Sequence, residues 1–571
     1  MSKVSAGLRL ALSLCLTATI GASSADARRE KLELRRTAIE LPGAPAVVLP
    51  ADLDGDGDRD LVLALAYTEW DQLSIEESTE MQGIEGLVEV MTIVPALADR
   101  RELRVFLADA DAPGGFRAAG DAVPLGPEVL SFARGPARWP VVALTDSGIS
   151  TLGLDAEGRP TLEPVLEDAP VLAGTGALYP DLNLVHDLDG DGGRDLLLPA
   201  PDGLAIYPER DGVWTEASAR LRLPHDERRA GRRGVERLYP LPRVEDVTGD
   251  GRLDLEVLSH RNGWRGLAVL PGVGGGRFGP PIEPLDDDSF PDDHAVIHVG
   301  DLDGDGRAEY VTQESLAEED AGMRQEMRQA KRPPFRYRLH RSGDSLAPAA
   351  EPYRTFEALG YTLSEGGGEM SDGGDGDGGE ASVGVTIPGG LQDLDGDGRR
   401  DLIALTLDFS MLQAVRILAT RTISIGLDFH LHCQGEDGQF RPVPDLDLSG
   451  RFKLNLDDIR MSQLSLFDGD FNGDGRADFV QLGRGKTVSI HAGQPGCSYP
   501  KKPDLTLRLK DEPRDLALVE IEDIDGDGLS DLRIVHPNRI DEPGVTPPVR
   551  LDLYLSGDVA HVANRAEGAD R

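Results

Sequence analysis

Short apolar segments along this chain alternate with turns rich in aspartate and glycine. An apolar run at 46–49 precedes one such turn, and a β-prone run at 61–65 follows it. Similar runs border other turns, at 295–299 and at 402–405. Runs of this length that are rich in Val, Ile and Leu and bounded by Gly and Asp are typical of β-strands. The pattern therefore predicts a repeated strand–turn–strand unit.

The turn is a nine-residue motif, D-x-[DNT]-G-D-G-x-x-[DE], and positions two and ten are apolar in every copy. Its seven copies are Asp52–Asp60, Asp187–Asp195, Asp246–Asp254, Asp301–Glu309, Asp393–Asp401, Asp470–Asp478 and Asp523–Asp531. The copies start between 53 and 135 residues apart. Two further strands follow in several units, as at 203–207 and 213–216. Four short strands per unit predict an all-β fold, a β-propeller of four-stranded blades.

The number of blades depends on the longest interval between motifs. Residues Glu128–Val165 contain three apolar runs but no acidic turn, and as a blade without the motif they bring the total to eight. Seven blades fit the sequence if this stretch is an insertion. We expect the ring to close by pairing the C-terminal strand Val549–Leu555 with an N-terminal strand at Lys31–Leu41, because closure removes exposed strand edges.

The acidic turns have the chemistry of a calcium site. Carboxylates this close together repel one another unless a cation compensates, and a hard divalent cation prefers several oxygen ligands. Glycine at positions four and six permits the positive φ values that fold the oxygens inward. We expect up to seven Ca²⁺ ions, held by side chains at positions one, three, five and nine and by the carbonyl at position seven. The expected ligands are Asp52, Asp54, Asp56, Asp58, Asp60, Asp187, Asp189, Asp191, Gly193, Asp195, Asp246, Thr248, Asp250, Arg252, Asp254, Asp301, Asp303, Asp305, Arg307, Glu309, Asp393, Asp395, Asp397, Arg399, Asp401, Asp470, Asn472, Asp474, Arg476, Asp478, Asp523, Asp525, Asp527, Leu529 and Asp531.

The motif is distinct from an EF-hand, which needs a bidentate Glu at position twelve; none of the seven copies has one. An acidic stretch at Ser371–Gly379 lacks both the apolar flanks and the carboxylate spacing, and we interpret it as a flexible loop. The loops are expected to differ in affinity. Because Thr248 supplies a neutral oxygen at position three, the Asp246–Asp254 site is predicted to be the weakest.

The motif resembles that of FG-GAP/VCBS-type repeats, the calcium-loop propellers of integrin α-subunit heads and of many bacterial exported proteins. The resemblance covers roughly 46–555, and a faint trace of the Phe-Gly signature remains at 277–281. It implies that the calcium loops join the first and second strands of each blade on one face. The opposite face, which carries the loops between the second and third strands, would then bind partners.

Composition narrows the class of partner. The chain has 571 residues and a formal net charge of -42, with 101 acidic residues against 59 Lys and Arg. This surplus of negative charge argues against nucleic acid and anionic lipid as partners. The odd-numbered motif positions hold 27 of the acids, so part of the acidity belongs to the predicted cation sites.

The N-terminus has the features of an export signal. Lys3 and Arg9 precede an apolar segment too short to span a bilayer, and Ala25–Ala27 matches a cleavage site. We therefore expect residues 1–27 to be a signal peptide and the protein to be periplasmic, at the cell surface or extracellular, with no transmembrane segment. Cys433 and Cys497 follow the expected third strands of adjacent blades, an arrangement compatible with one disulfide. A zinc site at His430, His432 and Cys433 is the less favoured alternative.

Residues 28–571 are expected to form one propeller domain with insertions at about 70–101, 315–331, 364–383 and 408–425, several of them helical. The insertions between the second and third strands suggest a surface for a protein or glycan ligand. No catalytic motif is present. A binding or scaffold module is the preferred function; a polysaccharide-acting enzyme similar to rhamnogalacturonan lyases, or a lectin, is the alternative.

Overall fold

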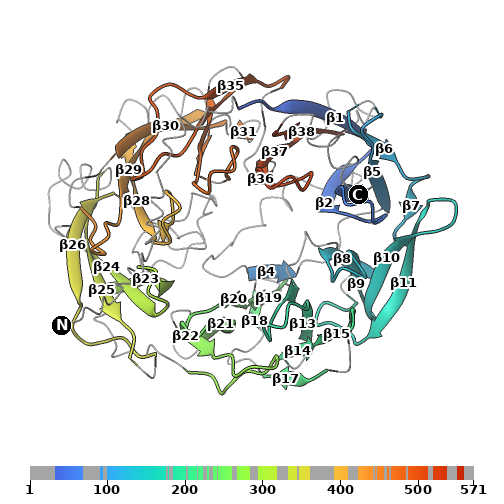
Figure 1. The fold of residues 1–571 in the computed structure, drawn as a ribbon, viewed down its shortest axis with the longest axis horizontal. Coiled ribbons are helices and arrows are strands. Elements are labelled where there is room, and N and C mark those ends of the chain that lie inside the picture. The colour runs from blue at the N-terminus through green and yellow to red at the C-terminus, as the bar shows by residue number, and fades with distance from the viewer. Residues whose placement is uncertain are drawn as a thin grey trace, which may run out of the picture. The chain divides into compact units, whose positions relative to one another are not determined.

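The computed structural model describes residues 32–557 except for 68–89, 94–99, 113, 175, 177, 179–183, 201–202, 215–216, 223–227, 231–235, 241, 260–265, 283–293, 318–331, 344–345, 361–390, 409–421, 442–443, 445, 456–459, 462–463, 468, 484–485, 512, 514–518 and 537–548. The predicted signal peptide lies outside the described residues. Within the unit from Leu32 onward, eight antiparallel sheets follow one another around a ring in chain order, and each is a propeller blade (Figure 1). The prediction of eight blades is therefore confirmed.

The first four blades include the one that lacks the motif. Blade 1 consists of β2 (Ala44–Ala51), β3 (Asp60–Tyr67), β5 (Arg100–Ala108) and β6 (Phe116–Ala118), with β7 (Val123–Pro124) also paired to β5. Blade 2, without the motif, consists of β8 (Val129–Arg134), β9 (Val141–Thr145), β10 (Gly148–Leu154) and β11 (Pro160–Glu167). Blade 3 consists of β12 (Val185–His186), β13 (Asp195–Ala200), β14 (Gly203–Tyr207) and β17 (Ala219–Leu221), with the hairpin β15 (Glu209–Arg210) and β16 (Val213–Trp214) at its third turn. Blade 4 consists of β20 (Arg243–Glu245), β21 (Asp254–Ser259), β22 (Gly266–Leu270) and a bridge from Val269 to Ile282 in place of a fourth strand.

The other four blades complete the ring. Blade 5 consists of β23 (His294–Asp301), β24 (Ala308–Ser315), β25 (Pro334–Arg341) and β26 (Arg354–Leu359). Blade 6 consists of β27 (Leu391–Gln392), β28 (Asp401–Asp408), β29 (Thr422–His432), β30 (Leu446–Asn455) and β31 (Arg460–Met461). Blade 7 consists of β32 (Leu464–Leu466), β33 (Phe479–Gly483), β34 (Thr487–His491) and β35 (Leu505–Arg508). Blade 8 consists of β36 (Val519–Glu522), β37 (Asp531–His536), β38 (Val549–Leu555) and β1 (Arg35–Leu41).

Blade 8 closes the ring with strands from both ends of the described chain, as predicted. β1 pairs antiparallel with β38 from Arg35 opposite Leu555 to Leu41 opposite Val549. The fully buried carboxylate of Asp552 lies within this sheet. It accepts hydrogen bonds from Arg36 at 2.8 Å and from Arg550 at 2.9 and 3.2 Å. A buried charge is tolerated only when it is paired, so this ionic cluster links the two ends of the propeller.

The apolar residues that flank each acidic turn hold neighbouring blades together. The position-two side chain of one blade shares a buried cluster with the position-ten side chain of the next blade. Examples are Val247 with Tyr310, Leu394 with Phe479, and Ile524 with Leu61. The invariably apolar flanks of the motif therefore form the interface between blades.

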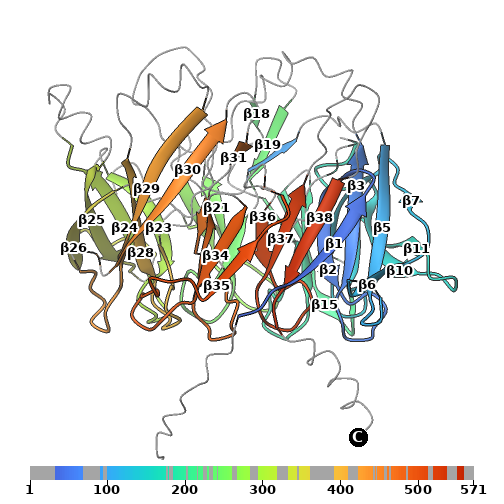
Figure 2. The same cartoon turned by 90° about the horizontal axis from the view of Figure 1, so that it is seen from above.

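The acidic turns join the first and second strands of seven blades, so they share one edge of the ring with the turns between the third and fourth strands. The connections between second and third strands lie at the opposite edge, as do β18 (Arg228–Ala230) and β19 (Glu236–Pro240) (Figure 2). β19 pairs with β4 (Val90–Ile93), which belongs to the insertion of blade 1. A loop of blade 1 thus reaches the segment that joins blades 3 and 4.

The described residues contain no helix, so the helical character expected of the insertions is wrong where it can be examined. Within 70–101, Val90–Ile93 is a strand and Arg100 already begins β5. Valine, threonine and isoleucine in this stretch favour an extended backbone, and pairing with β19 decides the outcome. The insertion at 315–331 starts in β24, and the insertion at 408–425 starts in β28 and ends in β29. Their interiors and all of 364–383 lie outside the described residues.

Candidate metal centres

Each acidic turn folds its carboxylates back over its own backbone. The glycines at positions four and six have φ values between 70° and 95° in all seven loops, as the motif requires. The position-one carboxylate accepts the N–H of position six in every loop, at 2.6–3.3 Å. The position-five carboxylate accepts the N–H of position seven, at 2.8–3.1 Å. These bonds hold both carboxylates in place over the loop.

The acid at position nine is buried in every loop, and in six of the seven loops it connects the acidic turn to a later part of its blade. One oxygen accepts the N–H of position two at 2.8–3.1 Å. In six loops the other oxygen accepts an N–H from the end of the third strand or from the turn after it, at 2.6–2.8 Å. These six donors are Ala108, Glu209, Gly272, Gln434, Gly493 and Ser556. The sequence did not reveal this second contact, because the donors lie 14 to 48 residues beyond the acid.

Burial changes the protonation of these acids. It raises the pKa of Asp60, Asp195 and Asp478 to about 6. Burial likewise raises the pKa of Asp401 and Asp531 to about 7. Neighbouring carboxylates of the same loop add to the shift. A nearby cation would oppose both effects, because it favours the charged form.

In each of four loops, the carboxylates of that loop lie close enough together to bind one ion. One oxygen from each residue lies within 4.8 Å of the others in the groups Asp52, Asp54 and Asp60; Asp187, Asp189 and Asp191; Asp301, Asp303, Asp305 and Glu309; and Asp393, Asp395 and Asp401. A carboxylate oxygen has two lone pairs, so one that accepts an N–H can still bind a cation.

Some of these oxygens also lack a hydrogen bond, which bears on whether the loops fit a cation. Among the described residues, Asp303 Oδ1, Asp395 Oδ1 and Glu309 Oε1 are buried without a hydrogen bond. In the other six loops, the corresponding oxygen of the position-nine acid accepts a second N–H, whereas Glu309 Oε1 accepts none. Burial raises the pKa of Glu309 to about 8. Buried oxygens without donors are costly in a protein that holds no cation there. The residues therefore fit a hard divalent ion.

Two arginines that the motif analysis missed lie over two of the loops. Arg210 forms ion pairs with Asp189 at 2.7 Å and with Asp191 at 2.9 Å. Arg341 forms ion pairs with Asp303 at 3.2 Å and with Asp305 at 2.8 Å. Both arginines come from the end of a third strand or the turn after it, where the sequence shows no motif. They partly neutralise the second and fourth loops.

Successive loops are also bonded to one another around the ring. The backbone N–H at position eight donates to the carbonyl at position two of the preceding loop, from Arg400 to Leu302 at 3.0 Å and from Ala477 to Leu394 at 3.1 Å. The approach is closest at Gly249, where an added Cβ would lie 1.0 Å from the carbonyl oxygen of Gly306. Neighbouring loops are therefore in direct contact around the ring.

The predicted bridge between adjacent blades is present: Cys433 and Cys497 form a disulfide. The two histidines of the alternative zinc site have other partners. His432 is buried with Nδ1 2.7 Å from the carbonyl oxygen of Arg441, and His430 Nε2 lies 3.0 Å from Thr406 Oγ1. With its cysteine in a disulfide, the zinc alternative has lost its thiolate ligand.

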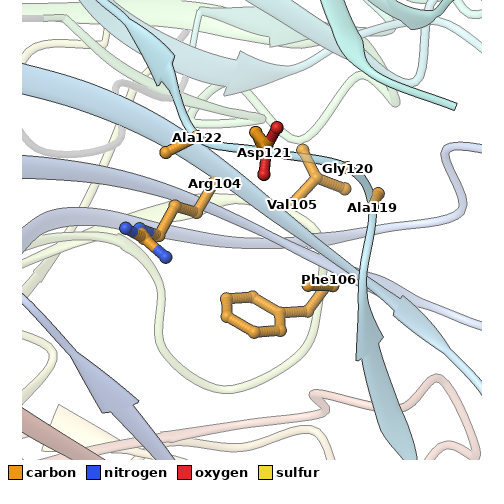
Figure 3. A pocket seen from close by; sticks show the side chains of 8 residues that line it. Arg104, Val105, Phe106, Ala119, Gly120, Asp121 and Ala122 are labelled. Atoms are coloured by element: carbon orange, nitrogen blue, oxygen red, sulfur yellow. The ribbon is translucent and has the colours of Figure 1, made fainter. Parts of the chain in front are cut away.

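A cavity of about 20 Å³ lies beside β5, between Arg104–Phe106 and Ala118–Ala122 (Figure 3). That volume holds about one water molecule, so it is too small for a sugar. Among the described residues, no helix has the length and apolar character needed to cross a bilayer.

The fold and the loops define the chain as an eight-bladed β-propeller with seven acidic turns on one edge. No protein-family model matches it, and no curated protein matches it. Among solved structures, it is similar to the Tc holotoxin pore of Photorhabdus luminescens, with a TM-score of 0.31 and 13% identity over 89% of this chain; the chain spans 23% of that toxin chain. The exotype rhamnogalacturonan lyase YesX has a TM-score of 0.26 and 11% identity, covering 92% of this chain and 74% of the lyase. The rhamnogalacturonan lyase YesW has a TM-score of 0.26 and 11% identity, covering 91% and 72%. Similarities this weak have no bearing on function.

Proposed function

We propose that this chain is an exported calcium-binding β-propeller of the FG-GAP/VCBS type, in which calcium has a structural role and the opposite face binds a protein or glycan partner. The observation that carries the proposal is that three or four carboxylates lie close together within a loop, and that in the loops of blades 5 and 6 some of their buried oxygens accept no hydrogen bond. Such a site is unfavourable without a cation and favourable with one.

The ligands would come from positions one, three, five and nine of each turn, with the position-seven carbonyl completing the set. When bound, the ion supplies positive charge that stabilises the ionised form of the buried position-nine acid. That acid in turn joins the first turn of a blade to its third turn through two N–H contacts. Ion binding is therefore expected to stiffen the whole loop edge of the propeller.

The stabilisation expected from each ion is modest. Open extracellular sites bind calcium at roughly 0.1–1 mM. At about 10 mM calcium, this affinity corresponds to roughly 1.4–2.7 kcal/mol per filled site. Several filled loops together would give a large shift in melting temperature.

The test is the melting temperature of the full chain after chelation and again after titration with calcium. We expect a marked increase with calcium and a much smaller one with an equal concentration of magnesium, which demands a tighter octahedral site. An unchanged melting temperature after thorough chelation would defeat the structural role of calcium.

The partner surface is proposed for the edge that carries the connections between second and third strands, because the two longest connections within a blade, from β3 to β5 and from β24 to β25, belong to it. A screen against polyuronides and neutral glycans, with and without calcium, separates binding from catalysis. Binding without turnover supports the module, whereas a released product would show an enzyme instead. N-terminal sequencing of the secreted protein tests the proposed export, and a first residue of Arg28 is the expected result.

A further inference from the structure

The Cys433–Cys497 disulfide lies beside the acidic turn of blade 6. Cys433 follows β29 in blade 6, and Cys497 lies in the turn after β34 in blade 7. Their Cα atoms are 6.0 Å apart, across 64 residues of sequence. The sulfur atoms of both cysteines and a carboxylate oxygen of Asp401 lie within 4.8 Å of one another. The bridge is therefore in direct proximity to the Asp393–Asp401 loop.

Residues next to both cysteines contact expected metal ligands of that loop. Gln434, which follows Cys433, donates its backbone N–H to Asp401 Oδ1 at 2.8 Å. Gly496, which precedes Cys497, donates its backbone N–H to Asp395 Oδ2 at 2.7 Å. The first contact comes from the same blade as the loop and the second from the next blade, so the disulfide joins the two donors covalently.

The contact from blade 7 has a particular consequence for Asp395. With Oδ2 held by Gly496, the other oxygen of this carboxylate, Oδ1, is buried without a hydrogen bond. The Gly496 turn is narrow, bridged from Gln494 to Ser498, with Cys497 at a φ of 47°. A side chain rarely adopts that conformation freely, so the covalent link helps to hold the turn, and with it the Gly496 donor, in place.

We propose that the disulfide is a positioning element of the Asp393–Asp401 calcium site, which it prepares by fixing the donors to Asp395 and Asp401. This inference rests on the proposed calcium binding. Holding ligands in their bound arrangement before the ion arrives lowers the entropic cost of binding. The turn that holds Cys497 also contacts the Asp470–Asp478 loop, through Gly493 and Asp478. The chain has only one further cysteine, Cys15, so no second disulfide can form at the other loops.

Linkage provides a readout specific to this one loop. If the disulfide increases calcium affinity by some factor, calcium must favour the disulfide over the dithiol by the same factor. The full chain is equilibrated in graded dithiothreitol, which is oxidised to its cyclic disulfide as the protein bridge is reduced. The fractions of reduced Cys433 and Cys497 are then measured by alkylation and mass spectrometry, with calcium and with chelator.

We expect calcium to shift this equilibrium roughly five-fold or more toward the disulfide, the lower end of typical coupling between sites. The Asp395→Asn variant should lose the shift, because its loop no longer couples the ion to Gly496. The matched variant Asp525→Asn removes the same motif position from the last loop, in blade 8, and should keep it. This control separates local coupling from a general resistance to unfolding.

The results distinguish the two levels of the proposal. A calcium-dependent melting temperature with an unshifted disulfide equilibrium would overturn the positioning role and leave the proposed function intact. An equal shift in wild type and Asp395→Asn would also overturn it. If calcium affects neither quantity, the proposed function itself fails. Should Asp395→Asn fold poorly, Asp393→Asn in the same loop serves as the second variant with the same expectation.

Discussion

Replacing Asp552 should lower the free energy of unfolding strongly, because this residue lies in the blade that closes the ring. Its carboxylate is fully buried between β1 and β37. Arg36 reaches it from the N-terminal strand at 2.8 Å, Arg550 at 2.9 and 3.2 Å, and His536 Nε2 lies 3.2 Å away. These partners hold the pKa of Asp552 well below its usual range by donating hydrogen bonds to it, against the opposing effect of burial.

Replacing Asp552 with Asn leaves the guanidinium groups of Arg36 and Arg550 without this anion. Removing one partner of a buried ionic cluster costs roughly 3–5 kcal/mol, a large part of the stability of an ordinary domain. The matched control is Asp511→Asn. Asp511 pairs with Arg550 at 2.6 Å and with Lys486 at 3.3 Å, but its side chain is 46% exposed. An exposed pair contributes roughly 0–1 kcal/mol.

The assay is urea unfolding of both variants in the presence of chelator, followed by hydrogen–deuterium exchange of β1. Asp552→Asn should lower the free energy of unfolding by several kilocalories per mole and increase exchange across 35–41, while Asp511→Asn changes little. If the two variants unfold within about 1 kcal/mol of each other, the ionic cluster does not hold the ring closed. The reasoning about closure would then be wrong.

Three further predictions concern the acidic turns. An acid whose pKa is raised by folding stabilises the folded state below its ordinary pKa, and this stabilisation is lost as the pH rises through the pKa of the folded state. The melting temperature of the calcium-free protein should therefore fall between about pH 4 and pH 8, the range set by the pKa values of Asp60 (about 6), Asp401 (about 7) and Glu309 (about 8). Calcium should make the melting temperature less dependent on pH. Gly251→Ala should cost roughly 1–2 kcal/mol because of its positive φ alone, whereas Gly249→Ala should cost more in the same urea titration, because its Cβ meets the Gly306 carbonyl. Arg341→Ala should raise the calcium affinity of the fourth loop roughly two- to five-fold, because it removes a partly exposed cation that competes with calcium for the carboxylates of that loop. The affinity is measured by calorimetry, and an unchanged or weaker affinity would show that Arg341 does not compete with calcium.

Local pattern was sufficient for most of the fold. Apolar runs on either side of each acidic turn predicted strands that the structure confirms at β2 and β3 and in six further blades. The blade at Glu128–Val165 was recognised without its motif, because it contains three apolar runs of the length of a strand. Closure by the two terminal strands followed from the need to leave no exposed edge. Of the helices expected in the insertions, the part at 90–93 can be examined, and there Val90–Ile93 is a strand that pairs with the distant strand β19.

The sequence by itself determined the strand–turn–strand units, their glycines with positive φ and the clustering of carboxylates within each loop, because these depend on residues fewer than ten positions apart. Only the tertiary structure decided which atoms those carboxylates meet. The second contact of the position-nine acids, the arginines over two loops, the bonds between neighbouring loops and the link from Gly496 to Asp395 all join residues from different turns or blades. Their spacing in the sequence varies with the length of the intervening connections, so no local pattern records them; they arise when antiparallel pairing brings alternate turns of each blade to one edge of the ring.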